Sequence, residues 1–561
     1  MPTRFCPNLC VNNMESRVGH RASQQLATLL IFIFCAGTSS LLEAQVTSGI
    51  HGTVTDQQGR PIVGAEVRVQ ADTTGVETNS STDSDGNFGV VGLPPGAYTV
   101  TAARDGFTTK VYARLDLTVN RQVRLDIILT VGSMHQTITV AAIPLLLETG
   151  TSSTGSTILP WQVESMPLNG GNYLDLLQLV PGVSINRAAP EGDDNSAPIL
   201  GERANNTYVL IDGMPNRDEV NGGPAEEFNQ DTILEFQVLT SGYKAEFGHG
   251  SGGIVNVLTK SGANDWHGTA SLFHRNYVLD SSDVAGARVP FLLRWDSNVT
   301  FSSRILKDRV FFFGSLERIR ESRKSNFQSP GDFPPSLRLQ EAQINKNGET
   351  YETRGFAKLN EQLGHHQLTQ EVNLTNTQLT DQGDQPSLRS NFGIRRVMVG
   401  IRDTALLGNQ SNPYVLSAYY QYRGEPFDHR PAHLEEGLPN IFVNLFTQLA
   451  TDAVFGDVAQ ESVGPGFTPL VLHQKYHSAG INLAKHAGRH DVKFGWDFQR
   501  TGVNGTEASN FSGILFATES DFKRYGLVNS GVNVSWEQSG IAPDKNHIRL
   551  RNLYDGLFFS G

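Results

Sequence analysis

Apolar and polar residues alternate in short runs along much of this chain. Three such runs lie before residue 131, with apolar positions at Ala65, Val67 and Val69, at Tyr98, Val100 and Ala102, and at Val123, Leu125, Ile127 and Leu129. A period of two places each apolar set on one face of a β-strand. Turn-forming residues separate the runs at 56–59, 83–86 and 94–96. The pattern predicts a small β-sandwich over residues 45–130.

A second group of alternating runs follows residue 262. Apolar rows occupy Val397, Val399 and Ile401, then Tyr414, Leu416, Ala418, Tyr420 and Tyr422, then Val492, Phe494, Trp496 and Phe498. The residues between them include Arg396, Gly400, Arg402, Lys493 and Asp497. A soluble β-sandwich and a lipid-facing barrel wall both produce this alternation.

The region between these two groups has a different pattern. In residues 166–183, Tyr173, Leu176, Leu177 and Val180 share one helical face, and Pro181-Gly182 ends the segment. Further on, GHGSGGIVNVLTKSG (248–262) contains the spacing G-x-G-x-x-G. That fingerprint binds a dinucleotide only where a helix follows the glycines. Here Ile254-Val255-Asn256-Val257 follows, which predicts a strand, so we expect no dinucleotide site.

Composition and charge narrow the class of protein. The chain has 561 residues, 56 glycines and a formal net charge of -12, which argues against electrostatic binding of nucleic acid. Arg17 and Arg21 precede an apolar run at 26–35, and we predict a signal peptide over residues 1–44. All three cysteines lie within that segment, so the exported chain would need no disulfide.

No motif for catalysis or for a cofactor stands out. The chain lacks H-E-x-x-H, a P-loop and a nucleophile elbow. Asp83, Asp85 and Asn87 have the spacing of calcium ligands without the rest of an EF-hand, so we expect a hairpin turn there. His473 and His477 lie four apart on a predicted strand, about 13 Å, too far for one ion. We therefore expect no catalytic residue, no cofactor and no metal.

The stretch GTVTDQQGRPIVGAEVRV (52–69), followed by TDSDGNFGVVGLPPGAYTVTAARDGF (82–107), resembles the carboxypeptidase regulatory-like domain. The resemblance implies an immunoglobulin-like or transthyretin-like sandwich without peptidase activity. Further on, MPLNGGNYLDLLQLVPGV, RANNTYVLIDGMP and the stretch 231–262 resemble, in this order, the plug domain of TonB-dependent outer-membrane receptors. The combination is similar to the Oar-like group of these receptors.

The resemblance assigns roles to particular residues. A linker at 131–157 would hold a TonB box, for which the candidate is Thr137, Ile138, Thr139, Val140 and Ala141. Without the resemblance, the same segment is equally suited to be the last strand of the sandwich. The plug would cover 158–262, and its structural motif comprises Arg203, Asp212, Gly213, Gly248, Gly250, Gly252 and Gly253. Arg203, Asp212 and Glu235 are candidates for charge pairs inside the plug.

Residues 263–561 would then form a transmembrane barrel. A barrel that encloses a plug has about 22 strands, whereas the roughly 300 residues after Gly262 suffice for ten or eleven. The last residues, Leu557 to Gly561, lie inside a predicted strand. We therefore expect a fragment or a truncated product. The predicted fold class is mainly β: a sandwich, an α+β plug and an incomplete antiparallel barrel.

The implied function is transport of an unidentified substrate across the outer membrane of a Gram-negative-type bacterium, with the sandwich in the periplasm. The implied partners are the TonB complex of the inner membrane, outer-membrane lipid and the substrate, for which carbohydrate is one candidate. Two other functions fit the same chain. One is an adhesion or carbohydrate-binding protein acting through the sandwich, and the other is a secreted enzyme with β accessory domains.

Overall fold

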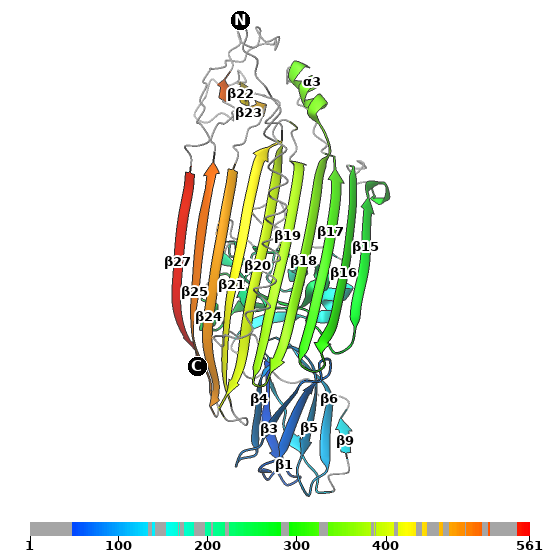
Figure 1. The fold of residues 1–561 in the computed structure, drawn as a ribbon, viewed down its shortest axis with the longest axis vertical. Helices are drawn as coiled ribbons and strands as arrows, with labels where there is room; N and C mark the ends of the chain where they lie inside the picture. Colours follow the sequence, from blue (N-terminus) through cyan, green and yellow to red (C-terminus); the bar gives the residue numbers. More distant parts are fainter. Residues whose placement is uncertain are drawn as a thin grey trace. The chain divides into compact units, whose positions relative to one another are not determined.

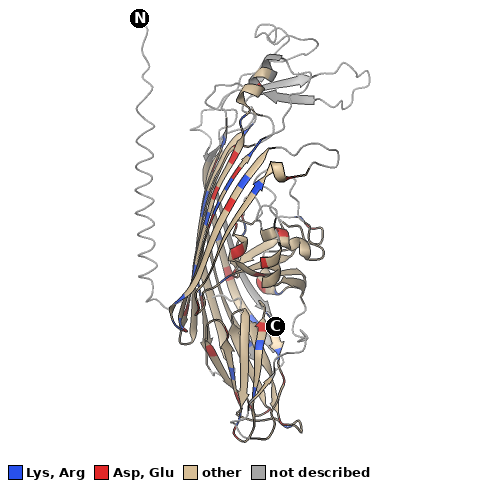
Figure 2. Ribbon diagram, turned by 90° about the vertical axis from the view of Figure 1, so that its right-hand side faces the viewer, with Lys and Arg blue, Asp and Glu red and all other residues tan. Residues whose placement is uncertain are grey.

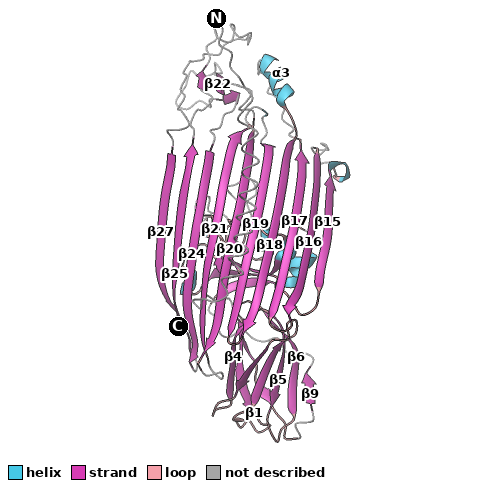
Figure 3. Ribbon diagram, in the orientation of Figure 1, coloured by secondary structure: helices cyan, strands magenta, loops and turns pink. Residues whose placement is uncertain are grey.

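The described chain consists of a β-sandwich, a plug with a mixed sheet, and one large antiparallel sheet (Figures 1 and 3). The computed structural model describes residues 48–119, 121–132, 137–140, 153–166, 168, 173–184, 197–203, 206–218, 224–248, 250–281, 291–324, 335–382, 386, 389–408, 413–432, 440–445, 459–463, 470–487, 490–507, 514–516 and 547–560. The predicted signal peptide lies outside these residues. Among them, no helix is long and apolar enough to cross a bilayer.

The sandwich packs two sheets around one apolar core. One sheet contains β4 (Asn87–Leu93), β1 (Ser48–Thr55), β7 (Gln122–Arg124) and β8 (Ile127–Ile128); the other has the order β3 (Glu77–Ser81), β2 (Glu66–Ala71), β5 (Gly96–Ala103), β6 (Thr109–Leu117) and β9 (Thr137–Val140). Val67, Val69 and Val100 are fully buried, whereas Glu66 and Arg68 between them are exposed. The alternation therefore predicted the inward faces correctly.

The turn at 83–86 is built on an aspartate side chain. Asp83 Oδ1 accepts the backbone N–H groups of Asp85 (2.9 Å) and Asn87 (2.8 Å). Such an Asx-type turn satisfies the backbone locally. The turn joins β3 to β4, which belong to different sheets, so it is not the hairpin expected from the sequence.

The plug is a five-stranded sheet covered by short helices. Its strand order is β10 (Thr154–Ile158), β13 (Ile233–Ser241), β14 (Ile254–Thr259), β11 (Tyr208–Ile211) and β12 (Met214–Pro215), and its helices are α2 (Pro160–Ser165), η1 (Tyr173–Leu179), η3 (Gln230–Thr232) and η4 (Ala245–Phe247). The helix expected within 166–183 is the 3₁₀-helix η1, whose Tyr173 ring stacks on Phe236 at 5.8 Å. Short connecting segments often take this tighter helix.

The glycine-rich stretch joins η4 to β14. Gly253 has φ +121°, a conformation that L-residues rarely adopt. A Cβ on Gly250 would lie 2.9 Å from Tyr208 Cβ, and one on Gly252 would lie 2.9 Å from Asn206 Cβ. A strand follows these glycines, not a helix, so this geometry does not form the phosphate-binding turn of a dinucleotide fold.

The large sheet has ten strands, each antiparallel to its neighbour. In order they are β15 (His267–Asn276), β16 (Leu292–Leu306), β17 (Val310–Arg323), β18 (Gly348–Leu363), β19 (His366–Gln382), β20 (Ser390–Leu407), β21 (Tyr414–Pro431), β24 (Leu470–Ala487), β25 (His490–Glu507) and β27 (His547–Ser560). Among the described strands the sheet is open between β15 and β27. Turned by 90°, the sheet is seen to curve, with the plug against its concave side (Figure 2).

The two ends of the large sheet differ. At one end β18 and β19 are joined by a two-residue turn, as short as the periplasmic turns of outer-membrane barrels. At the other end lie longer connections, which contain η5 (Tyr277–Leu279), α3 (Pro335–Ile344) and a small sheet of β22 (Asn440–Leu445), β23 (Ala459–Val463) and β26 (Ile514–Phe516). In outer-membrane barrels the end with the longer connections faces the cell exterior.

The alternation in the large sheet separates two surfaces. On β20, Ile401 is 39% exposed on the convex face, whereas Gly400 beside it faces Met214 of the plug. On β21, Tyr414 and Tyr420 are exposed, and Tyr419 is buried against Met214. The convex face is thus apolar and the concave face carries the polar set, as in a membrane barrel.

Replacing Gly253 by alanine tests the glycine-rich turn. We expect Gly253→Ala to destabilise the protein by about 1–3 kcal/mol, because φ +121° strains an L-residue. The new Cβ would also approach Ile199 Cδ1 to 2.7 Å. The measurement is thermal unfolding of the detergent-solubilised protein. Gly355→Ala, whose Cβ would meet only Leu316 Cδ1 at 4.0 Å, is the control. Equal effects of the two substitutions would contradict the assignment.

Candidate functional site

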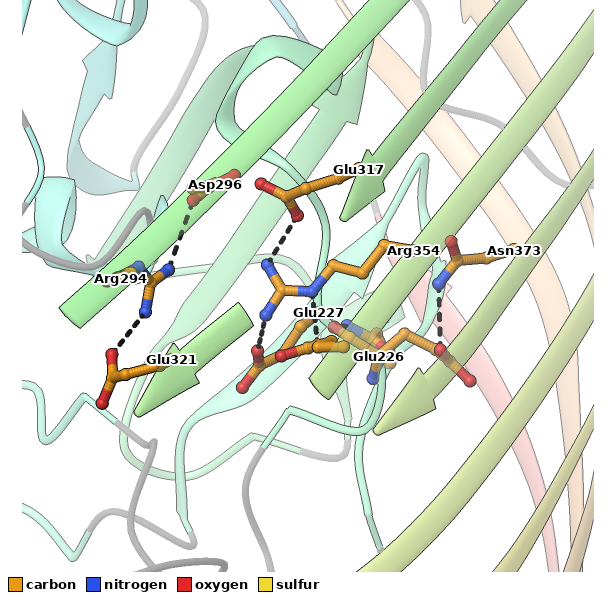
Figure 4. Close-up of polar contacts among 10 residues, drawn as sticks. Glu226, Glu227, Arg294, Asp296, Glu317, Glu321, Arg354 and Asn373 are labelled. Carbon is orange, nitrogen blue, oxygen red and sulfur yellow. Dashed lines mark hydrogen bonds and ion pairs between the residues drawn. The ribbon is translucent and has the colours of Figure 1, made fainter. Parts of the chain in front are cut away.

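The concave face of the large sheet and the plug share a buried polar interface. Its centre is Arg354 on β18, which is buried among three carboxylates (Figure 4). Arg354 donates to Glu227 of the plug (2.5 Å) and to Glu352 (2.6 Å) and Glu317 (3.2 Å) of the sheet. A guanidinium has five N–H donors in a fixed plane, so it can bind several carboxylates at once. One plug carboxylate is thereby held to two strands of the sheet.

Glu226, next to Glu227, is fully buried. Its Oε2 accepts a hydrogen bond from Asn373 Nδ2 on β19 (2.9 Å), and Asn216 holds its backbone N–H and C=O within the plug. Burial raises the pKa of the Glu226 carboxyl to about 8, against the opposing charges of Arg396 and Arg423. The raised pKa favours the protonated form of Glu226 while the plug is docked.

A second contact joins the Asp212-Gly213 turn of the plug to the sheet. Both residues have positive φ, 48° and 78°, as in the type I′ turns that connect paired strands. Asp212 Oδ2 accepts from Lys358 Nζ of β18 (3.0 Å) and from Thr259 Oγ1 (2.5 Å). Burial acts to raise the pKa of Asp212, but the charges of Lys358 and Arg402 and the Thr259 hydrogen bond lower it.

Further polar contacts extend the interface along the sheet. With those above, hydrogen bonds or ion pairs from the plug reach β16 (Asp231 to Asn298), β17 (Thr232 to Ser315), β18, β19, β21 (Arg217 to Arg423), β24 (Asp218 to Tyr476) and β25 (Glu246 to Lys493, Tyr208 to Gln499). Apolar contacts accompany them, such as the edge-on packing of Phe228 against Phe356. The plug is thus held at many points, each modest in energy.

The sandwich contacts the plug through Val119, in the segment that follows β6. Val119 N–H donates to Glu235 Oε1 on β13 (2.6 Å), and Val119 O accepts from Gln237 Nε2 (3.4 Å). Burial raises the pKa of Glu235 to about 7, although the Val119 hydrogen bond lowers it. In addition, Asn264, between plug and barrel, donates its backbone N–H to Thr73 O (3.0 Å) of the sandwich.

The residues singled out from the sequence fall at several places. Asp212 and Gly213 form the turn at the interface, and Gly250, Gly252 and Gly253 form the close approaches described above. Gly248 ends η4 with right-handed backbone angles, which any residue can adopt. Its backbone conformation therefore does not require glycine. Thr137 to Val140 form β9, whereas Ala141 lies outside the described residues.

The expected charge pairs inside the plug are not formed. Asp212 pairs with Lys358 of the large sheet, and Glu235 accepts a backbone N–H from the sandwich. Arg203 is exposed, and no ion pair of the described residues includes it. These two plug carboxylates are buried where the plug meets the large sheet and the sandwich. A buried carboxylate without a partner is costly, so each binds a group of the neighbouring domain.

Sequence reasoning missed the partners on the large sheet. Glu352, Arg354 and Lys358 occupy alternate positions with Phe356, all on the face toward the plug. Their spacing of two along the strand could have predicted a polar face turned toward the plug. The adjacent acids Glu226 and Glu227 gave no comparable signal, because nothing local indicates that they are buried.

Three domain families match the chain. The carboxypeptidase regulatory-like domain matches residues 49–130, the TonB-dependent receptor plug domain residues 152–255, and the outer membrane beta barrel domain residues 258–350. By domain content, the chain therefore resembles the TonB-dependent outer-membrane receptors, with a carboxypeptidase regulatory-like domain before the plug. That class belongs to the outer membrane of Gram-negative bacteria.

Within this class the chain is similar to the TonB-dependent transporter Oar of Myxococcus xanthus. The two are 25% identical over 304 residues, which cover 50% of this chain and 28% of Oar. The ferrienterobactin receptor of Escherichia coli K12 is 26% identical over 178 residues, covering 29% of this chain and 23% of the receptor. The chain thus spans less than a third of the length of either relative.

Solved structures with a similar fold include the outer membrane transporter YddB of Escherichia coli. It is 12% identical, with a TM-score of 0.46, over 72% of this chain and 54% of YddB. The pyoverdine receptor FpvA of Pseudomonas aeruginosa is 13% identical, with a TM-score of 0.46, over 74% of this chain and 54% of FpvA.

The protonated state of Glu226 predicts a dependence of stability on pH. A carboxyl whose pKa is raised from 4.5 to about 8 in the folded state contributes stability below pH 4.5. That contribution is lost as the pH rises through 8. Between pH 5 and 8 this carboxyl alone makes the free energy of unfolding fall by about 1.4 kcal/mol per pH unit. We expect Glu226→Gln to abolish that share of the slope. Part of the slope will remain, since Glu235 titrates in the same range.

The measurement is the midpoint of thermal unfolding from pH 5 to pH 9. Glu164→Gln is the matched control, because Glu164 is 59% exposed in its pair with Lys260 and should leave the slope unchanged. If Glu226→Gln keeps the wild-type slope, the carboxyl is not held protonated in the docked plug.

Proposed function

We propose that this protein is a TonB-dependent outer-membrane transporter whose plug closes the passage through the barrel until the inner-membrane partner moves it. The observation that carries the proposal is the interface between the plug and the large sheet. Polar contacts from the plug reach seven strands, and the central ones, around Arg354 and Lys358, are buried. An element held at so many points closes a passage well and needs work to be moved.

The chemistry of the interface is suited to reversible movement. Buried hydrogen bonds and ion pairs are costly to leave unmade in a dry environment, but water can replace them once the interface opens. A partner that pulls on the plug would therefore exchange protein–protein contacts for contacts with water. An apolar interface of the same size would offer no such replacement.

The proposal assigns a role to each part of the chain. The candidate TonB box, residues 137–141, would bind the TonB complex, and the apolar convex face of residues 263–561 would contact outer-membrane lipid. Substrate would bind between the outward loops and the plug at 158–262, and the protein would perform no chemistry on it. The sandwich at 45–130 would lie in the periplasm, after removal of residues 1–44. The substrate is unidentified. Two classes are to be compared: a metal chelate, because two relatives are named as receptors for ferric enterobactin, and a carbohydrate.

A disulfide between plug and sheet tests this function. Thr232 Oγ1 and Ser315 Oγ lie 2.8 Å apart across the interface, so Thr232→Cys with Ser315→Cys can be crosslinked. The variant would replace the chromosomal gene in the source bacterium. Uptake of radiolabelled ferric enterobactin and of radiolabelled maltohexaose would be compared with that of a deletion strain. A probe that the deletion strain fails to take up is a substrate of this protein. We expect cells with the oxidised double variant to exclude that probe, and to take it up again after reduction of the disulfide.

The two single-cysteine variants are the controls and should transport normally under both conditions. Normal uptake through the oxidised double variant would contradict the gating role of the plug. A deletion strain that loses surface binding of carbohydrate, with all uptake intact, would instead favour the adhesion function of the sandwich.

A further inference from the structure

Three exposed arginines lie on the convex face of the large sheet. Arg318 and Arg320 are on β17 and Arg395 is on β20, and the strands from β17 to β20 lie side by side (Figure 1). Glu317 and Ile319, which alternate with the two arginines of β17, are buried on the concave side. We call the three arginines, together with Tyr351 of β18, the arginine patch.

The strand register places the patch where the convex face changes from apolar to polar. One row across β17 to β20 has no polar side chain and consists of Leu316, Gly355, Leu374 and Val397. The next row toward the longer connections is polar throughout and consists of Arg318, Thr353, Asn376 and Arg395. Beyond it, across β16 to β19, lie Trp295, Arg320, Tyr351 and Gln378. A border marked by tryptophan and tyrosine is typical of the level at which hydrocarbon gives way to lipid headgroups.

The patch differs from the arginines of the concave face in its charge balance. Arg354 and Arg396 on that face are each paired with carboxylates. Among the residues that the structure describes, no ion pair includes an arginine of the patch. A lipid-facing arginine costs about 2–4 kcal/mol at the middle of a bilayer and about 0–1 kcal/mol near its surface. Three such charges are therefore tolerable at the headgroup level, where an anion from outside the chain can reach them.

The side chains of the patch are arranged to receive such an anion. The guanidinium carbons of Arg318 and Arg320 lie 5.9 and 5.4 Å from the centroid of the Tyr351 ring, and Arg318 also donates a hydrogen bond to Thr353 Oγ1. Two like charges held against one ring repel each other, and an anion bound between them relieves the repulsion. Guanidinium groups bind phosphate through two parallel hydrogen bonds, so phosphate is the anion that they fit best.

We propose that the arginine patch binds the phosphate groups of lipid in the outer leaflet of the membrane. Three strand spacings separate Arg318 from Arg395, or about 14 Å, which is wider than a single phosphate. The patch therefore fits a headgroup that carries two phosphates. This inference rests on the proposed function, which places the convex face in the outer membrane.

A comparison of two lipids tests the patch without altering the protein. The full chain in detergent would be titrated with lipid A that carries both phosphates, and with the same lipid after both have been removed, and bound lipid would be measured by native mass spectrometry. We expect the phosphorylated form to bind at least about tenfold more tightly, because each phosphate adds charge-assisted hydrogen bonds. Equal binding of the two lipids would overturn the inference. Displacement of the lipid by millimolar inorganic phosphate would assign the patch to a soluble anion and also overturn it.

A triple substitution assigns the binding to these residues. We expect Arg318→Gln/Arg320→Gln/Arg395→Gln to abolish the preference for the phosphorylated lipid. The matched control changes the net charge equally at three exposed arginines of the sandwich and is Arg60→Gln/Arg68→Gln/Arg124→Gln. It should keep the wild-type preference. A preference that survives in the patch variant, or that both variants lose equally, would contradict the assignment.

Two further measurements keep the test decisive. If the triple variant does not fold, Arg395→Gln alone leaves the contacts of Tyr351 intact and should still weaken the preference. If the plug gates uptake as proposed but the lipid preference is absent, this inference alone fails. If the protein is missing from the outer-membrane fraction of the source bacterium, the proposed function fails, and this inference fails with it.

Discussion

The buried ion pair between Asp212 and Lys358 is the contact on which the plug and the large sheet depend most directly. Both groups are almost completely removed from water, and an isolated buried charge is far too costly to exist in the docked state. Each charge is stabilised first by the other, with Arg402 as a second cation acting on Asp212 and Thr259 as a hydrogen-bond partner of both groups. The plug therefore docks with Asp212 against Lys358, which the alternation of β18 places on the inner face of the sheet.

The rest of the interface follows from the same constraint. A barrel wall must be apolar toward lipid, so the period of two confines its polar residues to the face that meets the plug. Arg354 is satisfied by Glu227, Glu317 and Glu352 together, whereas burial raises the pKa of Glu226 and favours its neutral form. At the other end of the plug, the sandwich docks by the same means, through a backbone N–H directed at a buried carboxylate.

Much of the fold could be predicted from the sequence, because strand patterning is local. The inward and outward rows around Val397 and Tyr414 were assigned from alternation alone, and the strand after the glycines excluded a dinucleotide site.

The interface between the plug and the large sheet could not be predicted in the same way. Glu227 and Arg354 are 127 residues apart, and no local pattern pairs them. For the same reason Asp212 and Glu235 were, with Arg203, candidates for charge pairs inside the plug, whereas their partners come from the large sheet and the sandwich. The segment at 137–140 was suited both to a TonB box and to a last strand; it forms strand β9 of the sandwich, and its role as a box stays a proposal.

Hydrogen exchange of the plug strands β11 and β14 tests the central claim most directly. Lys358→Met and Asp212→Asn each remove one partner of the buried pair, and the double variant removes both. If the pair holds the plug, each single variant should raise the opening equilibrium by about 3 kcal/mol, roughly a hundredfold. The double variant should exchange more slowly than either, because no buried charge is then left unpaired. Wild-type exchange in both single variants would contradict the account, since the Asp212–Lys358 pair would then contribute nothing to holding the plug.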